Sequence, residues 1–240
     1  MINIASYIDH TILKPVTTYI EIKKICEEAR AYGFAAVCVP PPLVRLAVET
    51  LEAPRKGSPA AFRRGVKTLS RGARQVKVAT VIGFPFGYSA AKAKLLEADQ
   101  ALADGADELD VVINLVALKN GDWDLLGREM LDIIYRADGH GKIVKVIIES
   151  GILTEEEIIR CCGLYSKLGA NFLKTSTGYA ERGATLEAVQ LMRRHLPPEV
   201  KIKASGGIRT YAFASELVAA GADRLGCSAS VAIVEEERKA

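Results

Sequence analysis

The feature that most constrains the fold is a regular alternation of short apolar runs with longer amphipathic segments along the 240 residues. The runs are rich in β-branched residues and end at Gly, Pro or polar clusters, as strands do. The segments between them have helical spacing. Strands that alternate with helices favour a parallel sheet with right-handed crossovers. Eight runs predict strands, at residues 7–11, 34–39, 76–82, 108–114, 143–149, 171–176, 200–205 and 223–227.

The number of units and the chain length favour a closed barrel. Eight strand–helix units close the TIM (β/α)8 barrel, for which about 250 residues is typical. We therefore expect an α/β fold that forms one domain over residues 1–240. A doubly wound open sheet is the alternative.

Repeated signals mark the ends of the helices. Gly-Ala followed by Asp or Asn occurs at residues 105–107, 169–171 and 221–223, each time just before or at the start of a predicted strand. The glycine suits the left-handed position that ends many helices. Thr154 and Glu157 have the spacing of a capping box, which predicts the start of another helix.

One segment interrupts the alternation. Residues 53–75 carry seven Lys or Arg and no acid, and three Pro or Gly residues break the start of the segment. We expect an exposed basic insertion before the third strand, with one short helix near residues 60–69. The insertion is either a solvated loop or a contact surface for a polyanion or a neighbouring subunit.

Composition excludes several classes of function. The five cysteines and three histidines offer no metal-ligand spacing, so we expect reduced thiols, no metal and no other cofactor. No apolar run approaches the roughly 18 residues that span a membrane, and the N-terminus does not resemble a secretory signal. We expect a cytoplasmic protein without membrane association. The net charge of +3 is too small to indicate nucleic-acid binding.

Two lysines occupy unusual positions near the ends of predicted strands. Lys174 and Lys203 each precede small residues and glycines, although an ammonium buried without a partner tends to lose its proton. Residues two apart in a strand share a face, so the apolar neighbours turn outward and the lysines turn inward, as does Asp110. Active sites of this fold lie at the C-terminal ends of the strands. We expect these three residues to form one cluster.

Such a cluster suits amine chemistry on a carbonyl. One cation beside another promotes the neutral amine that a Schiff base requires. The alternative for Asp110, Lys174 and Lys203 is a buried structural ion pair. Lys145 and Glu149 share a face of the fifth predicted strand, and we expect them to form a supporting ion pair.

Three glycine-containing turns follow the late predicted strands, at residues 176–178, 205–207 and 226–228. Loops after barrel strands seven and eight, with a short helix N-terminus, commonly bind phosphate through backbone N–H groups. We therefore expect a phosphorylated small molecule as substrate. The candidate binding residues in these turns are Thr177, Gly178, Ser205, Gly206, Gly207, Gly226 and Ser228.

Five motifs together resemble the deoxyribose-phosphate aldolase family. They are KTSTG with Lys174, KASGGIR with Lys203, ELDVV with Asp110, TVIGFPFG and KVIIESG. The similarity runs from IDHTILKP to RLGCSASVAIV and leaves out only the basic insertion and the last few residues. It implies a metal-free lyase of deoxyribonucleotide and carbohydrate degradation. Its reaction is the reversible cleavage of 2-deoxy-D-ribose 5-phosphate to D-glyceraldehyde 3-phosphate and acetaldehyde.

The resemblance also implies roles for single residues. Lys174 is the Schiff-base lysine, and the charge of Lys203 lowers its pKa. Lys203 also takes part in proton transfer, and Asp110 moves protons through an ordered water. Further residues near the substrate or the lysines are Asp9, Thr11 and Cys38.

Two departures from the family pattern stand out. Ala229 follows Ser228 where relatives often have a second serine, so one hydroxyl that usually reaches the phosphate is missing. The chain ends VEEERKA, without the C-terminal tyrosine that assists a proton transfer in some relatives. We therefore expect phosphate binding to depend more on backbone N–H groups.

Relatives of this family are commonly dimers or tetramers, so we expect a homodimer or homotetramer. A second enzymatic reading is another phosphate-handling barrel, either a different Schiff-base aldolase or a sugar-phosphate epimerase. A non-enzymatic reading is a polyanion-binding protein that uses residues 53–75.

Overall fold

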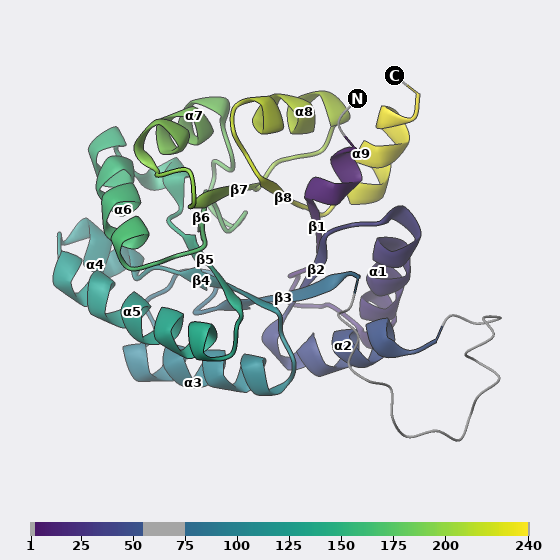
Figure 1. The fold of residues 1–240 in the computed structure, drawn as a ribbon, viewed down its shortest axis with the longest axis horizontal. Helices are drawn as coiled ribbons and strands as arrows, with labels where there is room; N and C mark the ends of the chain where they lie inside the picture. Colours follow the sequence, from purple (N-terminus) through teal and green to yellow (C-terminus); the bar gives the residue numbers. More distant parts are fainter. Residues whose placement is uncertain (1–2, 55–74, 240) are drawn as a thin grey trace.

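The computed structural model describes residues 3–54 and 75–239 and forms a closed barrel of eight parallel strands (Figure 1). Each strand pairs with the next in the chain, and the eighth pairs with the first. The TIM barrel is confirmed, and the open-sheet alternative is wrong. The strands are β1 (Ile8–Thr11), β2 (Ala36–Val39), β3 (Lys77–Ile82), β4 (Glu108–Val112), β5 (Ile143–Ile147), β6 (Phe172–Lys174), β7 (Lys201–Ser205) and β8 (Arg224–Cys227).

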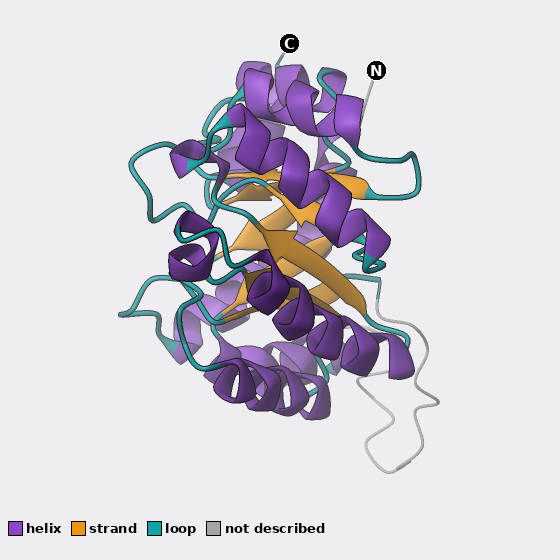
Figure 2. Cartoon of the chain, turned by 90° about the vertical axis from the view of Figure 1, so that its left-hand side faces the viewer, coloured by secondary structure: helices purple, strands orange, loops and turns teal. Residues whose placement is uncertain are grey.

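Helices surround the barrel on its outside (Figures 1 and 2). A 3-10 turn, η1 (Ile4–Tyr7), precedes β1, and two more, η2 (Pro41–Leu43) and η4 (Ser150–Ile152), follow β2 and β5. The helices are α1 (Tyr19–Tyr32), α2 (Val44–Glu52), α3 (Ala91–Ala103), α4 (Leu115–Lys119), α5 (Trp123–Gly139), α6 (Glu155–Lys167), α7 (Leu186–His195), α8 (Tyr211–Ala219) and α9 (Ser230–Glu237).

The signals for helix ends are confirmed. Thr154 and Glu157 form the predicted capping box at the start of α6. Gly105, Gly169 and Gly221 all have positive φ, which permits the sharp exit from α3, α6 and α8.

Two residues after each of these glycines, an Asp or Asn side chain binds a backbone N–H group near the start of the preceding odd-numbered strand. Asp107, Asn171 and Asp223 accept hydrogen bonds from backbone N–H groups of β3, β5 and β7. Each of these side chains thus binds the strand that comes before it in the chain. β6 and β8 each begin one residue later than predicted, after Asn171 and Asp223, and β6 also ends two residues earlier, at Lys174.

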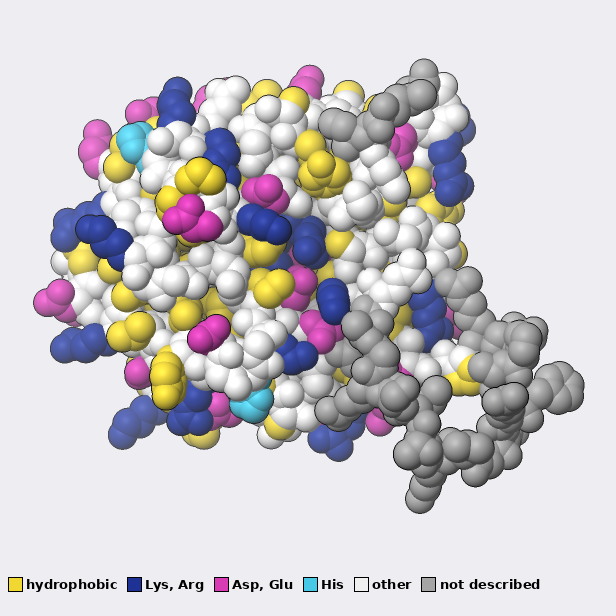
Figure 3. Space-filling view, viewed as in Figure 1, with side chains coloured by type: hydrophobic (Ala, Val, Ile, Leu, Met, Phe, Trp, Pro, Cys, Tyr) yellow, Lys and Arg dark blue, Asp and Glu magenta, His cyan; other side chains and the backbone are white. Residues whose placement is uncertain are grey.

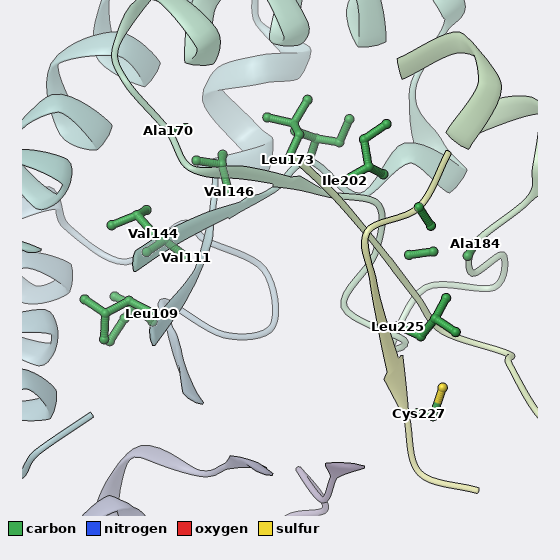
Figure 4. Packing of buried hydrophobic residues seen from close by; sticks show 14 of the residues in the cluster. Leu109, Val111, Val144, Val146, Ala170, Leu173, Ala184, Ile202, Leu225 and Cys227 are labelled. Atoms are coloured by element: carbon green, nitrogen blue, oxygen red, sulfur yellow. The ribbon is translucent and has the colours of Figure 1, made fainter. Parts of the chain in front are cut away.

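The hydrophobic core lies between the strands and the helices. Figure 4 shows outward-facing side chains from the later strands in this layer, among them Val111, Leu173 and Ile202. The barrel interior has a smaller apolar cluster of Cys38, Ala79 and Val81. The interior also holds buried charged residues of β1, β4, β5, β6 and β7, and these charges define the candidate site below.

The predicted basic insertion and its short helix lie outside the described residues, apart from its ends at 53–54 and 75. The five cysteines are buried and free, as predicted. In the described part of the chain, no helix has the length and apolar character to cross a membrane. Figure 3 shows side chains of both charges near the centre of the face viewed there.

Candidate active site

Two adjacent strands bring the two predicted lysines together. Lys174 ends β6, and its register partner on β7 is Lys203. Their chain neighbours Leu173 and Ile202 are buried in the outer core, so both lysines face the barrel interior. The exposed fraction is 3% for Lys174 and 0% for Lys203. Both amines are therefore held where an ammonium without partners would be costly.

Asp110 of β4 joins the two amines. Its Oδ2 accepts from Nζ of Lys174 and from Nζ of Lys203, each at 2.7 Å. Its Oδ1 accepts from Nζ of Lys145 on β5 at 2.9 Å. The cluster expected from strand alternation is thus present, with a third lysine added.

A second set of charges lies against this cluster. Asp9 of β1 forms ion pairs with Lys203 and, at 2.7 Å, with Arg224 of β8. Lys145 forms an ion pair with Glu108 of β4. Every one of these carboxylates is almost completely buried, so the ion pairs are shielded from solvent.

The lysines differ in the direction of their pKa shifts. Burial and the neighbouring Lys203 cation lower the pKa of Lys174, although Asp110 opposes them. Burial also disfavours the charged form of Lys203, but Asp110 and Asp9 outweigh it and raise the pKa of Lys203. Burial disfavours the Asp110 carboxylate too, yet the three lysines hold its pKa well below the ordinary value. The environment thus makes Lys174 easier to deprotonate than an ordinary lysine and Lys203 harder to deprotonate.

The predicted supporting pair of Lys145 and Glu149 is wrong. Lys145 instead pairs with Asp110 and Glu108. Glu149 accepts hydrogen bonds from the backbone N–H and the hydroxyl of Thr177. Glu149 has φ of 57°, an uncommon value for a residue with a side chain, and burial raises its pKa. It therefore holds the loop after β6 in place.

A pocket of about 480 Å³ opens above this cluster. Its wall includes most of the predicted site residues, whereas Asp9, Cys38, Asp110 and Lys203 are completely buried and lie outside that wall. Lys174 is therefore the one amine of the cluster that lines the pocket. The predicted residues on the wall are Thr11, Lys174, Thr177, Gly178, Ser205, Gly206, Gly207, Gly226 and Ser228.

Close approaches of neighbouring atoms explain the glycines Gly206 and Gly226 of this wall and Gly183 beside it. A Cβ added to Gly183 would lie 2.3 Å from the carbonyl oxygen of Gly206. Gly206 itself has φ of 88° and lies against Gly183 and Gly178. On β8, a Cβ at Gly226 would lie 3.1 Å from Cε of Lys203. Gly226 therefore leaves room for the Lys203 side chain as well as lining the pocket.

Strand alternation did not find several residues of the pocket wall. Lys14, Lys24 and Arg209 bring positive charge to it and Glu21 and Glu28 bring negative charge, and Tyr179 also belongs to the wall. The Tyr179 hydroxyl donates to the carbonyl oxygen of Leu13, and its ring meets Phe84 edge-on at 5.2 Å. Lys14 and Arg209 lie directly within the quoted motifs IDHTILKP and KASGGIR, and their position after a strand was the available signal.

The other predicted groups have definite places. Cys38 lies beside the cluster, and burial together with Asp110 raises the pKa of its thiol to about 11. Ala229 precedes α9 and provides no side-chain cap for that helix. Among the residues that the structure describes, no three His, Cys, Asp or Glu side chains form a group able to hold a metal ion.

Comparison with known proteins identifies aldolases as relatives of this chain. Residues 3–229 match the family described as DeoC/LacD family aldolase. The chain is 49% identical over 238 residues to a deoxyribose-phosphate aldolase of Thermococcus gammatolerans, covering 99% of this chain and 98% of that protein.

Two solved structures have the same fold at substantial identity. An aldolase called QR15 superimposes with a TM-score of 0.85 and 39% identity, covering 100% of this chain and 97% of the other. The deoxyribose phosphate aldolase of Aeropyrum pernix, described as a unique tetrameric structure, gives a TM-score of 0.81 and 31% identity over 98% and 91%.

Proposed function

The chain belongs to the DeoC/LacD family of aldolases and is a lyase with the deoxyribose-phosphate aldolase activity of its full-length relatives, and we propose that it acts through a Schiff base on Lys174. The observation that carries this assignment is the position of Lys174. It is the lysine of the buried cluster that reaches the pocket, and its pKa is lowered. A neutral amine at the base of a pocket is what carbonyl addition requires.

In the cleavage direction, the neutral Nζ of Lys174 adds to the C1 aldehyde of open-chain 2-deoxy-D-ribose 5-phosphate. Loss of water from the carbinolamine gives an iminium ion. The iminium accepts the electron pair of the C2–C3 bond as that bond breaks, and the C3 hydroxyl loses its proton to form the aldehyde of D-glyceraldehyde 3-phosphate. The enamine that remains is protonated at C2 and hydrolysed to acetaldehyde and free Lys174.

Asp110 and Lys203 are the proposed proton-transfer groups of these steps. The Asp110 carboxylate accepts a hydrogen bond from the Lys174 amine at 2.7 Å. The Lys203 amine donates to the same carboxylate oxygen, also at 2.7 Å. Because the pKa of Lys203 is raised and that of Asp110 is lowered, the resting pair is a cation and an anion. A water between Asp110 and the substrate would carry protons to and from the carbinolamine.

The phosphate is proposed to bind at the glycine turns. Gly206 and Gly207 both have positive φ, and their loop lies on the pocket wall with Gly178 and Ser228. Lys14 and Arg209 line the same pocket and supply positive charge. Turns that present backbone N–H groups, together with nearby cations, suit a phosphate dianion.

We further propose that the protein is a homodimer or homotetramer that works in the cytoplasm. The Aeropyrum pernix relative is a tetramer. Exposed apolar side chains on the adjacent helices α3 and α5, namely Leu96, Leu131 and Tyr135, give a surface suited to self-association. Free buried cysteines fit a reducing compartment.

Light scattering on the protein as it elutes from a size-exclusion column tests the assembly. The measured mass should be two or four times that of the monomer, and a monomer mass would contradict the proposed assembly.

Reductive trapping tests the central assignment. Borohydride added with acetaldehyde or with the sugar phosphate should leave a covalent adduct on Lys174, located by peptide mass mapping. The Lys174→Ala variant should lose the adduct and its turnover. An adduct on another lysine, or full turnover by Lys174→Ala, would refute the Schiff-base assignment.

A further inference from the structure

Six charged side chains, five of them buried and the sixth, Arg224, partly buried, form a closed ring in which acids and bases alternate. Starting from Asp110, the ring passes through Lys145, Glu108, Arg224, Asp9 and Lys203 and returns to Asp110. Successive contacts are 2.9 Å from Asp110 to Lys145, 3.6 Å from Glu108 to Arg224, 2.7 Å from Arg224 to Asp9 and 2.7 Å from Lys203 to Asp110. The two remaining contacts, Lys145 with Glu108 and Asp9 with Lys203, are direct ion pairs.

This ring has no net charge when all its members are ionised. Its carboxylates are Asp9, Glu108 and Asp110, and its cations number the same. Among the described residues, Asp110 is the one acid within ion-pair distance of Lys174. The Asp110 carboxylate already binds Lys145 and Lys203. A charged Lys174 would therefore be a surplus cation in a buried site.

We propose that this charge ring keeps Lys174 neutral, and that Glu108 and Arg224 are positioning residues which set the balance without touching the substrate. The inference rests on the proposed Schiff-base function of Lys174. Neither Glu108 nor Arg224 belongs to the pocket wall. They act through the ring, since an added or missing charge within it changes the electrostatic cost of a proton on Lys174.

Two further titratable groups interact with Lys174 electrostatically, Cys38 and Glu149, and both have raised pKa values, which favour their neutral forms. The Cys38 thiol on β2 is neutral, because burial and Asp110 raise its pKa. Glu149, after β5, also faces Lys174; its carboxyl is hydrogen-bonded by Thr177, and burial raises its pKa. The raised pKa values of Lys145 and Lys203 agree with cations that stay charged inside the ring.

Two single substitutions should move the protonation of Lys174 in opposite directions. Glu108→Gln removes an anion, which lowers the Lys174 pKa. The acid limb, meaning the pH range over which the labelling rate of Lys174 falls as the amine is protonated, then moves to lower pH. Arg224→Gln removes a cation, which raises that pKa and moves the limb to higher pH. Each shift should be about one pH unit, as expected for one charge roughly 10 Å away at an effective dielectric constant near 20.

The double variant Glu108→Gln/Arg224→Gln restores the balance and should return the limb to the wild-type position. The measurement is the pH dependence of the initial rate at which cyanoborohydride and acetaldehyde label Lys174, followed by mass spectrometry. Glu129→Gln is the matched control, because Glu129 is also a buried carboxylate paired with a lysine, Lys94, but lies outside the ring. Its limb should stay in place.

Opposite shifts with recovery in the double variant would support the ring. Shifts in one direction only, no shift, or a double variant with summed defects would overturn it. Arg224 has a side chain that is 16% exposed and is the ring member whose loss folding should tolerate best, so its shift to higher pH alone decides the proposal if Glu108→Gln does not fold. Wild-type protein without an adduct on Lys174 would instead refute the proposed function, and this inference with it.

Discussion

Lys174 and Lys203 have the same side chain and adjacent positions, yet the structure gives them opposite properties. Two carboxylates bind Lys203, Asp9 and Asp110, so its ammonium is compensated. Lys174 shares a single carboxylate with two other lysines. The opposite pKa shifts of the two lysines thus come from the number of neighbouring anions, because burial lowers the pKa of both.

At Lys203 we expect the Lys203→Met variant to fold and to lose at least about 100-fold in kcat, because a proton-transfer group and the adjacent cation are both removed. Steady-state cleavage of the sugar phosphate measures the loss, and circular dichroism checks the fold. Lys201→Met is the control: Lys201 begins the same strand and is exposed. Equal losses in the two variants would show that a lysine in β7 matters only for structure.

At the scale of single elements, the loop that carries Gly183 determines how the glycine turns meet. We expect Gly183→Ala to raise KM for the phosphorylated sugar about tenfold, since the new methyl group would clash with the Gly206 carbonyl and displace the turn. The reaction of unphosphorylated 2-deoxyribose should change much less. A KM effect of equal size on both sugars would contradict a phosphate role for this turn.

Gly163→Ala gives the matched control for that change. Gly163 lies within α6 and has no heavy atom within 4 Å of an added Cβ. The same substitution there should leave KM unchanged and raise stability by a few tenths to about 1 kcal/mol, because alanine loses less backbone entropy on folding.

Asn171, just before β6, binds a backbone N–H group near the start of β5. Asn171→Ala removes the acceptor for the Val144 N–H and should lower the free energy of unfolding by about 1 kcal/mol, with kcat unchanged. Urea unfolding measures the change. Asn120→Ala removes an exposed amide that donates to the Val116 carbonyl and should cost less. If the two variants lost the same stability, the edge would not depend on Asn171.

How far the sequence predicted these elements depends on the range of the contacts involved. Alternation within a strand correctly turned Lys174, Lys203 and Asp110 inward, because it is a property of adjacent residues. The pairing of Glu108 with Arg224 and of Asp9 with Lys203 depends on the register of the closed barrel, which local spacing does not contain. For the same reason local spacing predicts Glu149, four residues further along the chain, as the partner of Lys145, whereas its partners are the acids of β4.

At the scale of the whole molecule, buried carboxylates couple stability to pH. The ring cations hold the pKa of Asp9 and Asp110 below the ordinary value of about 3.9 even though burial opposes this. The stability they contribute is present above the ordinary pKa and is lost as the pH falls toward the folded pKa. We expect stability to decline progressively below about pH 4.

Unfolding at a series of pH values tests this coupling. Asp9→Asn should show a smaller loss of stability between pH 5 and pH 3 than the wild type, because one of the shifted carboxyls is gone. Asp122→Asn is the control, since Asp122 is an exposed cap at the start of α5. An unchanged acid slope in Asp9→Asn would contradict the coupling.

The path of the charge ring around the barrel also has a consequence for biosynthesis. The ring draws on β1, β4, β5, β7 and β8, so it is complete only when the first and last strands meet. In the sequence Lys174 precedes Lys203 and Arg224, so a nascent chain contains Lys174 before either of these cations has been translated. A truncated product that ends after β6 would therefore carry the proposed nucleophile without the Lys203 cation that lowers its pKa in the complete barrel.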